Sequence, residues 1–229
     1  VRFDLRALPG RQVPYFISAK GPERMAEGDT FAALASQIQS AAEVWNTVKT
    51  SELRLAFCGF TAPEAALEGP RIEVIFDEIP PGLVAMAGPE VLGDVAEEQG
   101  VPFIPIVRSL LVLPSNLAEP ARPSWSERLY QTIVHELGHT FGLQHSWASG
   151  TMSTEITRAT TKGSPLGADD VAGVSVLYPA RNFREQTATI SGRVFRAGVG
   201  AGVPLASVVA FSPTGDAVSV LTGPDGRYL

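Results

Sequence analysis

HELGHTFGLQH, residues 135–145, holds all three histidines of this 229-residue chain. His135 and His139 are four residues apart, so on a helix their side chains project from one face and can bind one metal ion. Gly142 can take a backbone conformation that other residues resist, which lets the chain leave the helix and return His145 to the same ion. Three neutral imidazoles with an open fourth position are typical of a catalytic zinc site.

Other interpretations of this motif are weaker. A structural zinc site fills all four positions, often with cysteine, and Cys58 is the only cysteine and lies far along the chain. A third ligand could instead come from a later carboxylate. Glu155 is the nearest candidate, but residues 146–154 are rich in Ser, Thr and Gly and show no helical period. Two exposed histidines on a helix and a third on a loop, without any metal, remain the alternative.

The motif resembles the zinc signature of the metzincin proteases. Ser146, directly after the third histidine, is similar to the matrixin branch of that clan. Met152, in SGTMS, resembles the methionine of the Met-turn that underlies the metal. PLGADDVAGVSVLYP, residues 165–179, resembles the last helix of matrixin catalytic domains, including its acidic pair Asp169 and Asp170. The resemblance is strong over 120–180 and weak before it.

This resemblance implies a zinc-dependent endopeptidase that acts on extended protein or peptide substrates. One catalytic zinc is expected on the three histidines, with Glu136 as the general base for a water bound to the metal. Met152 would form an apolar floor under the ligands. Asp169 and Asp170 would brace the Met-turn and the N-terminal segment. Calcium is a further family cofactor, but no calcium-binding motif supports it here.

Composition limits the other function classes. The net charge is −6 and only 18% of residues are charged, which argues against nucleic acid as a partner. No apolar run approaches the length of a membrane span. The chain begins with Val and shows no signal peptide, so we expect a mature form or an excised fragment. The resemblance implies a secreted, extracellular monomer. The alternative is a catalytically silent metzincin fold in an extracellular binding or adhesion protein.

The predicted fold class is α+β: a zincin-like catalytic domain with a twisted mixed sheet and three helices, followed by part of an all-β sandwich. Apolar residues recur every three or four positions over 30–48, which predicts an amphipathic helix. Ser124 and Glu127 fit a capping box for the motif helix, which is expected over 125–141. Strands are predicted at 13–19, 52–57, 71–76 and 103–114, and the burial habit of free cysteine predicts that Cys58 is buried.

Residues 79–91 carry proline and glycine on both sides of LVAMAG, which predicts an edge strand or a connecting loop. In metzincins an edge strand above the zinc binds the substrate backbone. The substrate-binding residues are therefore predicted to be Val84, Ala85, Met86 and Ala87. STEITR, residues 153–158, would wall the substrate pocket and leaves the specificity open.

The amino-acid composition changes after NFREQ, residues 182–186. The predicted domains are therefore residues 1–180, a linker at 181–187, and a module at 188–229. The module is rich in Val and punctuated by Gly and Pro, which predicts three or four short strands. It resembles the opening of a carboxypeptidase-regulatory-like (transthyretin-like) β-sandwich. The first domain is expected to fold independently.

Overall fold

The computed structural model describes residues 1–62, 65–154 and 160–229. The chain divides into two compact units. Unit 1 comprises Val1–Lys49, Leu53–Gln144 and Thr161–Pro165. Unit 2 comprises Thr50–Glu52, His145–Thr160 and Leu166–Leu229. The mixture of helices with a mixed sheet confirms the predicted α+β fold class.

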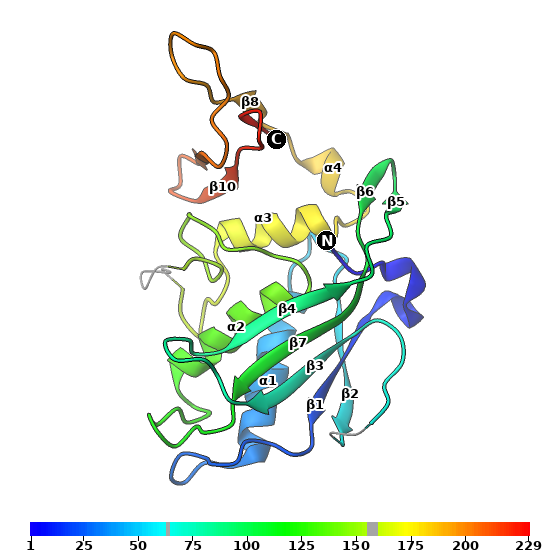
Figure 1. The fold of residues 1–229 in the computed structure, drawn as a ribbon, viewed down its shortest axis with the longest axis vertical. Coiled ribbons are helices and arrows are strands. Elements are labelled where there is room, and N and C mark those ends of the chain that lie inside the picture. The colour runs from blue at the N-terminus through cyan, green and yellow to red at the C-terminus, as the bar shows by residue number, and fades with distance from the viewer. Residues whose placement is uncertain (63–64, 155–159) are drawn as a thin grey trace. The chain divides into compact units, whose positions relative to one another are not determined.

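Unit 1 is built on a five-stranded sheet in the order β2-β1-β3-β7-β4. The four strands other than β4 run parallel, and β4 pairs antiparallel with β7 at the edge (Figure 1). A small hairpin of β5 and β6 follows β4, and the sequence analysis did not anticipate it. The strands are β1 Val13–Ser18, β2 Leu55–Thr61, β3 Arg71–Asp77, β4 Met86–Val91, β5 Ala96–Glu98, β6 Val101–Phe103 and β7 Ile106–Pro114.

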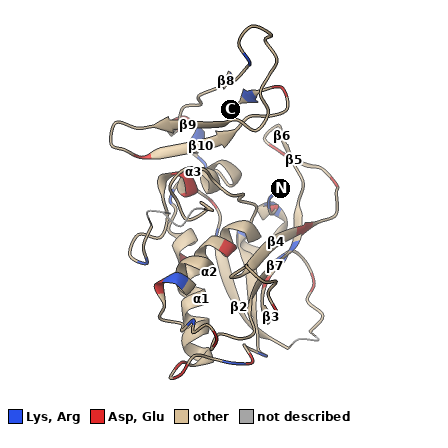
Figure 2. Ribbon diagram, turned by 60° about the vertical axis from the view of Figure 1, so that its left-hand side comes forward, with Lys and Arg blue, Asp and Glu red and all other residues tan. Residues whose placement is uncertain are grey.

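Helices α1 (Phe31–Asn46) and α2 (Glu127–Thr140) cover one face of this sheet, as Figures 1 and 2 show. Thr30 caps α1 by accepting a hydrogen bond from the Ala33 amide. The apolar stripe predicted for this helix is the face that it buries. Trp45 is fully buried and donates its indole N–H to the Val134 carbonyl at 3.1 Å. This bond joins α1 to the helix that carries the histidine motif.

The start of α2 differs from the prediction. Ser126 is the N-cap, and its hydroxyl accepts from the Leu129 amide. Ser124 instead donates its amide N–H and its hydroxyl to the Asp29 carboxylate, at 2.6 and 2.7 Å. The capping-box spacing to Glu127 favoured Ser124, whereas Ser126 has Leu129 at the third position and caps the helix through its hydroxyl alone.

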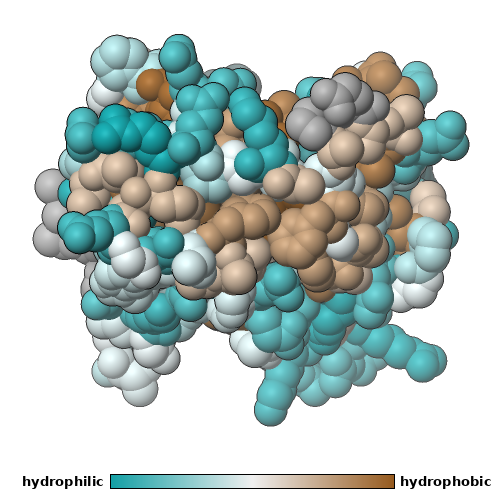
Figure 3. Space-filling view, turned by 90° about the horizontal axis from the view of Figure 1, so that it is seen from below, coloured by the Kyte–Doolittle hydropathy of each residue, from teal (hydrophilic) through white to brown (hydrophobic). Residues whose placement is uncertain are grey.

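Strand β2 also corrects two predictions. It begins at Leu55, three residues later than expected, and it is the second edge of the sheet. Cys58 is exposed and not buried, because an edge strand leaves part of its surface uncovered. Phe57 and Phe60 on the same strand are 36% and 52% exposed. Large apolar side chains of this strand therefore reach the surface. Figure 3 shows hydrophobic residues gathered at the centre of the face that it draws.

Unit 2 contains α3 (Ala168–Leu177), the short α4 (Phe183–Gln186) and four short strands. Val174 and Tyr178 of the α3 region are buried. The strands form two antiparallel pairs, the hairpin of β9 with β10 and the more distant pair of β8 with β11. Their bounds are β8 Gly192–Arg193, β9 Ser207–Phe211, β10 Ala217–Leu221 and β11 Arg227–Tyr228. The division into a domain, a linker and a sandwich module remains a prediction.

Two features of the structure bear on the partners of the chain, namely the distribution of its charged residues and the length of its apolar helices. Acidic and basic residues are scattered along the described chain (Figure 2). Among the residues that the structure describes, no helix is both long and apolar enough to span a membrane.

Candidate metal centre

Helix α2 presents the first part of the motif. Its last two turns carry His135, Glu136 and His139. The side chains of His135 and Glu136 are buried, at 4% and 7% exposure, and His139 is half-buried. The Nε2 atoms of the two histidines lie 3.2 Å apart. The four-residue spacing therefore places the two imidazoles against each other, as helix geometry requires.

Gly142 ends the helix. Its φ of 109° lies in the left-handed region that glycine favours. The Gly142 amide donates to the His139 carbonyl at 3.1 Å, and the Leu143 amide donates to the Gly138 carbonyl at 3.0 Å. These bonds satisfy carbonyls at the helix end. They also direct the chain sharply away from the helix axis, as the sequence predicted.

The same turn sets the tautomer of His139. Its Nδ1 atom lies 2.8 Å from the Leu143 carbonyl oxygen. Because a carbonyl can only accept, Nδ1 carries the proton and donates it, and the Nε2 lone pair of the neutral ring faces His135. Leu143 acts here through its backbone, so no side-chain signal in the sequence could have identified it.

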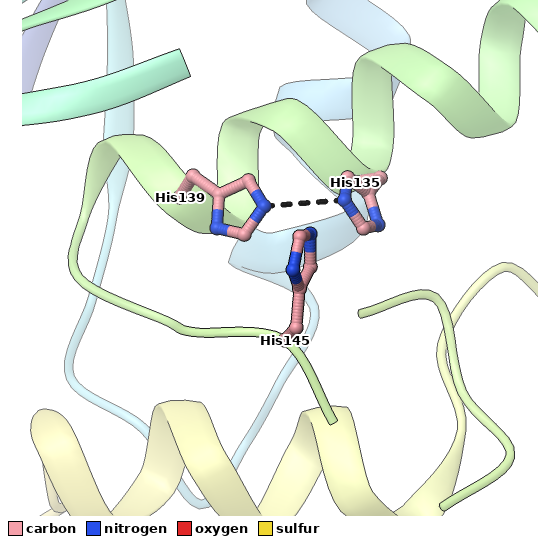
Figure 4. A group of neighbouring side chains, drawn as sticks. All are labelled: His135, His139 and His145. Carbon is pink, nitrogen blue, oxygen red and sulfur yellow. Dashed lines mark hydrogen bonds between the residues drawn. The ribbon is translucent and has the colours of Figure 1, made fainter. Parts of the chain in front are cut away.

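His145 completes the cluster. One nitrogen from each of His135, His139 and His145 lies within 4.8 Å of the other two. Figure 4 shows two rings projecting from the helix and the third pointing toward them from the following loop. Two nitrogens on one tetrahedral zinc are separated by about 3.3 Å, given a bond length of about 2.0–2.1 Å. The 3.2 Å between the two helical histidines matches that separation, so these residues fit a zinc ion.

Met152 lies in a tight turn of unit 2 that one carboxylate holds. Asp170 accepts hydrogen bonds from the amides of Thr151 and Met152 at 2.6 and 2.9 Å. It also accepts from the Gly167 amide at 2.7 Å, which caps α3. Burial raises the pKa of Asp170, and the three amide donors oppose that effect. Met152 itself is buried, at 2% exposure.

Two glycines make room for this carboxylate. A Cβ atom on Gly150 would come within 2.8 Å of the Asp170 carboxylate. A Cβ atom on Gly167 would come within 2.9 Å of the Ser149 carbonyl. Either side chain would force the turn to shift, since real Cβ contacts are essentially never this short. The glycines in SGTMS and PLGADD therefore have a packing reason.

Asp169 makes a different set of contacts. It accepts a short hydrogen bond from the Ser146 hydroxyl and another from the Ser219 amide at 2.5 Å. Within unit 1, Arg2 of the N-terminal segment forms a bridge with Pro105. That the acidic pair braces this segment stays a prediction. Ser219 belongs to β10, and nothing in the sequence indicated that it would reach this carboxylate.

The predicted substrate-binding residues lie at the start of edge strand β4. Met86 and Ala87 are its first two residues, whereas Val84 and Ala85 precede it. Ala85 is buried, at 6% exposure. The strand runs on through Pro89 to Val91, so the predicted strand LVAMAG, residues 83–88, was placed three residues too early. Glu155 and most of the predicted pocket wall fall within 155–159, outside the described residues.

A family model described as matrixin matches residues 41–179, more than half of the chain. This chain belongs to the matrixin family. The match begins within helix α1 and includes the histidine motif and helix α3, so the metal cluster lies within it. The domain is therefore of the zinc metalloprotease type, and protein is its class of substrate. No curated protein matches the chain. The module that follows the domain remains a prediction.

Replacing Asp170 by Ala should destabilise this matrixin domain strongly. The change leaves three buried amide donors without their acceptor, which costs at least about 3 kcal/mol in the free energy of unfolding. Asp170→Asn keeps one acceptor oxygen and should cost less. Urea denaturation measures both, with the exposed Asp94→Ala as a control expected within about 0.5 kcal/mol of wild type. An Asp170→Ala protein as stable as the control would contradict the bracing role.

Proposed function

We propose that this matrixin is a zinc-dependent endopeptidase in which His135, His139 and His145 bind the metal and Glu136 is the general base. The observation that carries the proposal is the convergence of three imidazoles, together with the burial of Glu136, which follows His135 in the chain. A structural zinc site would fill its fourth position with a protein ligand. Among the described residues, the group that could hold a metal contains these three histidines alone, which leaves a position for substrate.

The chemistry divides between the metal and the chain. A zinc ion held by three imidazoles supplies Lewis acidity, which polarises a carbonyl and acidifies a water molecule. Glu136 accepts the proton of the attacking water and passes it to the amine that leaves when the peptide bond breaks. The hydrogen bond to the Leu143 carbonyl keeps His139 in the tautomer that can bind metal.

Strand β4 is the proposed binding edge for an extended substrate. An edge strand supplies backbone hydrogen bonds to any peptide, whatever its side chains. Pro89 has no N–H to give, yet it pairs with Ser109 of β7, so its nitrogen faces the open edge. Because strand residues alternate, the N–H of Ala87 faces the open edge as well. Ala87 is therefore the proposed backbone contact among the four predicted residues.

The remaining expectations are also proposals. Secretion and a monomeric state are proposed from the resemblance to matrixins. The amino-acid sequence that the enzyme cleaves stays open. The competing function is a catalytically silent fold that only binds its partners. The intact Glu136 at the motif's second position favours catalysis, and a hydrolysis assay with a chelator control separates the two.

Glu136→Gln should abolish most hydrolysis and leave the metal bound. The amide has nearly the shape of the carboxylate but cannot accept the proton, and Glu136 is not a ligand. We expect a rate about 10² to 10⁴ lower. Elemental analysis should give about one zinc per chain for both proteins. The exposed Glu97→Gln should match wild type in both assays. Wild-type activity in Glu136→Gln would contradict the mechanism.

Ala87→Pro should raise KM for peptide substrates about tenfold, because one backbone hydrogen bond is lost. The pairing of β4 with β7 should persist, since the substituted nitrogen faces outward as that of Pro89 does. Ala87→Gly keeps the N–H and serves as the control, with KM close to wild type. If both variants behave alike while zinc content is unchanged, the substrate does not bind along this edge.

A further inference from the structure

Strand β10 contacts the helix that holds the Met152 turn. The Ser219 amide donates to Oδ1 of Asp169 at 2.5 Å, and the Ser219 hydroxyl donates to Oδ2 at 3.2 Å. Asp169 is in the first turn of α3, next to Asp170. All of these residues belong to unit 2. The C-terminal hairpin is thus bonded to the same helix turn that organises the Met152 loop.

The Ser219 amide points out of its own hairpin. Strands β9 and β10 pair antiparallel with Ser219 opposite Val209. The hairpin bonds flanking β10 involve the backbones of Asp216 and Thr222, both at even positions. In an antiparallel ladder such positions alternate, so Ala217, Ser219 and Leu221 direct their amides away from β9. Ser219 therefore has a donor that the hairpin does not need.

Asp169 connects this donor to the loop that begins with the third histidine. Its carboxylate accepts from the hydroxyl of Ser146, the residue directly after His145. The Ser146 amide in turn donates to the Met152 carbonyl at 2.9 Å, and its hydroxyl accepts from the Ala148 amide at 3.0 Å. Ser146 is therefore held through both its backbone and its side chain. Its hydroxyl is bonded to Asp169 and also lies 3.2 Å from the Ser219 hydroxyl.

We infer that Ser219 is a positioning residue for the metal site, acting through Asp169 and Ser146 on His145. The inference rests on the proposed zinc-binding role of His145. Two donors from different segments fix the Asp169 carboxylate in one orientation. Without the Ser219 amide the carboxylate can turn toward water, and Ser146 loses its anchor. The C-terminal hairpin would then set the affinity of the site for metal, although it supplies no ligand.

Ser219→Pro in the full chain removes both the amide and the hydroxyl donor and leaves the hairpin bonds in place, since a proline fits an outward-facing edge position. Leu221→Pro is the matched control. The Leu221 amide faces the same side of the strand as that of Ser219, and none of the described hydrogen bonds joins it to Asp169 or Asp170. Competition with a chelator measures zinc affinity. We expect Ser219→Pro to bind about tenfold more weakly and Leu221→Pro to stay within about twofold of wild type.

Two further readouts separate positioning from general damage. The visible absorption of the cobalt-loaded protein depends on ligand geometry, so it should change in Ser219→Pro and not in the control. In an Asp169→Ala background, Ser219→Pro should have little additional effect on affinity, because only the 3.2 Å contact between the Ser146 and Ser219 hydroxyls is then left to lose. Additive losses would overturn the inference.

Hydrogen exchange on the wild-type chain tests the same coupling without a variant. If Ser219 favours metal binding, metal binding must favour the Ser219 contact by the same free energy. The Ser219 amide should therefore exchange about tenfold more slowly with zinc bound. Equal exchange, or equal zinc affinity in Ser219→Pro, would overturn the inference alone. A wild-type chain that binds no zinc would overturn the proposed function and the inference with it.

Discussion

The carboxylate of Asp170 is the constraint on which the loop around Met152 depends. Asp170 is buried. Its carboxylate accepts hydrogen bonds from the amides of Thr151 and Met152 in the loop and from the amide of Gly167 at the start of α3. A buried charge of this kind is stable only when donors surround it. Once the donors are in place, the turn has few alternatives. Gly150 and Gly167 follow from this constraint, since any side chain there would enter the space of the carboxylate or its neighbours.

Unit 1 solves a related problem with apolar packing. Helix α2 must hold two imidazoles in fixed positions, and its inner face is buried along its length. Trp45 packs edge-on against Phe141 at 4.9 Å and bonds to the Val134 carbonyl, so α1 fixes both the middle and the end of α2. The Ser109 hydroxyl donates to the Thr140 carbonyl at 2.5 Å and ties the last helical turn to β7. His135 and His139 are therefore carried by a helix whose position is fixed by α1 and β7.

The sequence predicted those features that repeat or that carry a dense motif. The period of α1 and the three-histidine spacing each involve several residues, so single exceptions did not matter. Predictions from one or two residues were less secure. Ser124 and Ser126 both suit a helix cap, and the choice depended on Asp29 from a distant segment. The exposure of Cys58 depended on which strand forms the edge, which no local pattern encodes.

The contacts of the acidic pair show the same limit. The resemblance to matrixins correctly associated Asp170 with the Met152 turn, because both motifs are local and specific. It could not indicate that Asp169 binds Ser219, since that contact joins residues fifty positions apart through a backbone amide. Backbone donors and acceptors carry no side-chain signature. Both Ser219 and Leu143 therefore emerged only from the three-dimensional structure.

The proposed endopeptidase function depends most on three imidazoles that bind one zinc ion. X-ray absorption spectroscopy of the zinc-loaded protein measures the ligands and their distances directly. Three histidine nitrogens at about 2.0–2.1 Å, with one oxygen ligand in the fourth position, are the predicted result. A sulfur ligand at about 2.3 Å, or fewer than three imidazoles on the metal, would contradict it.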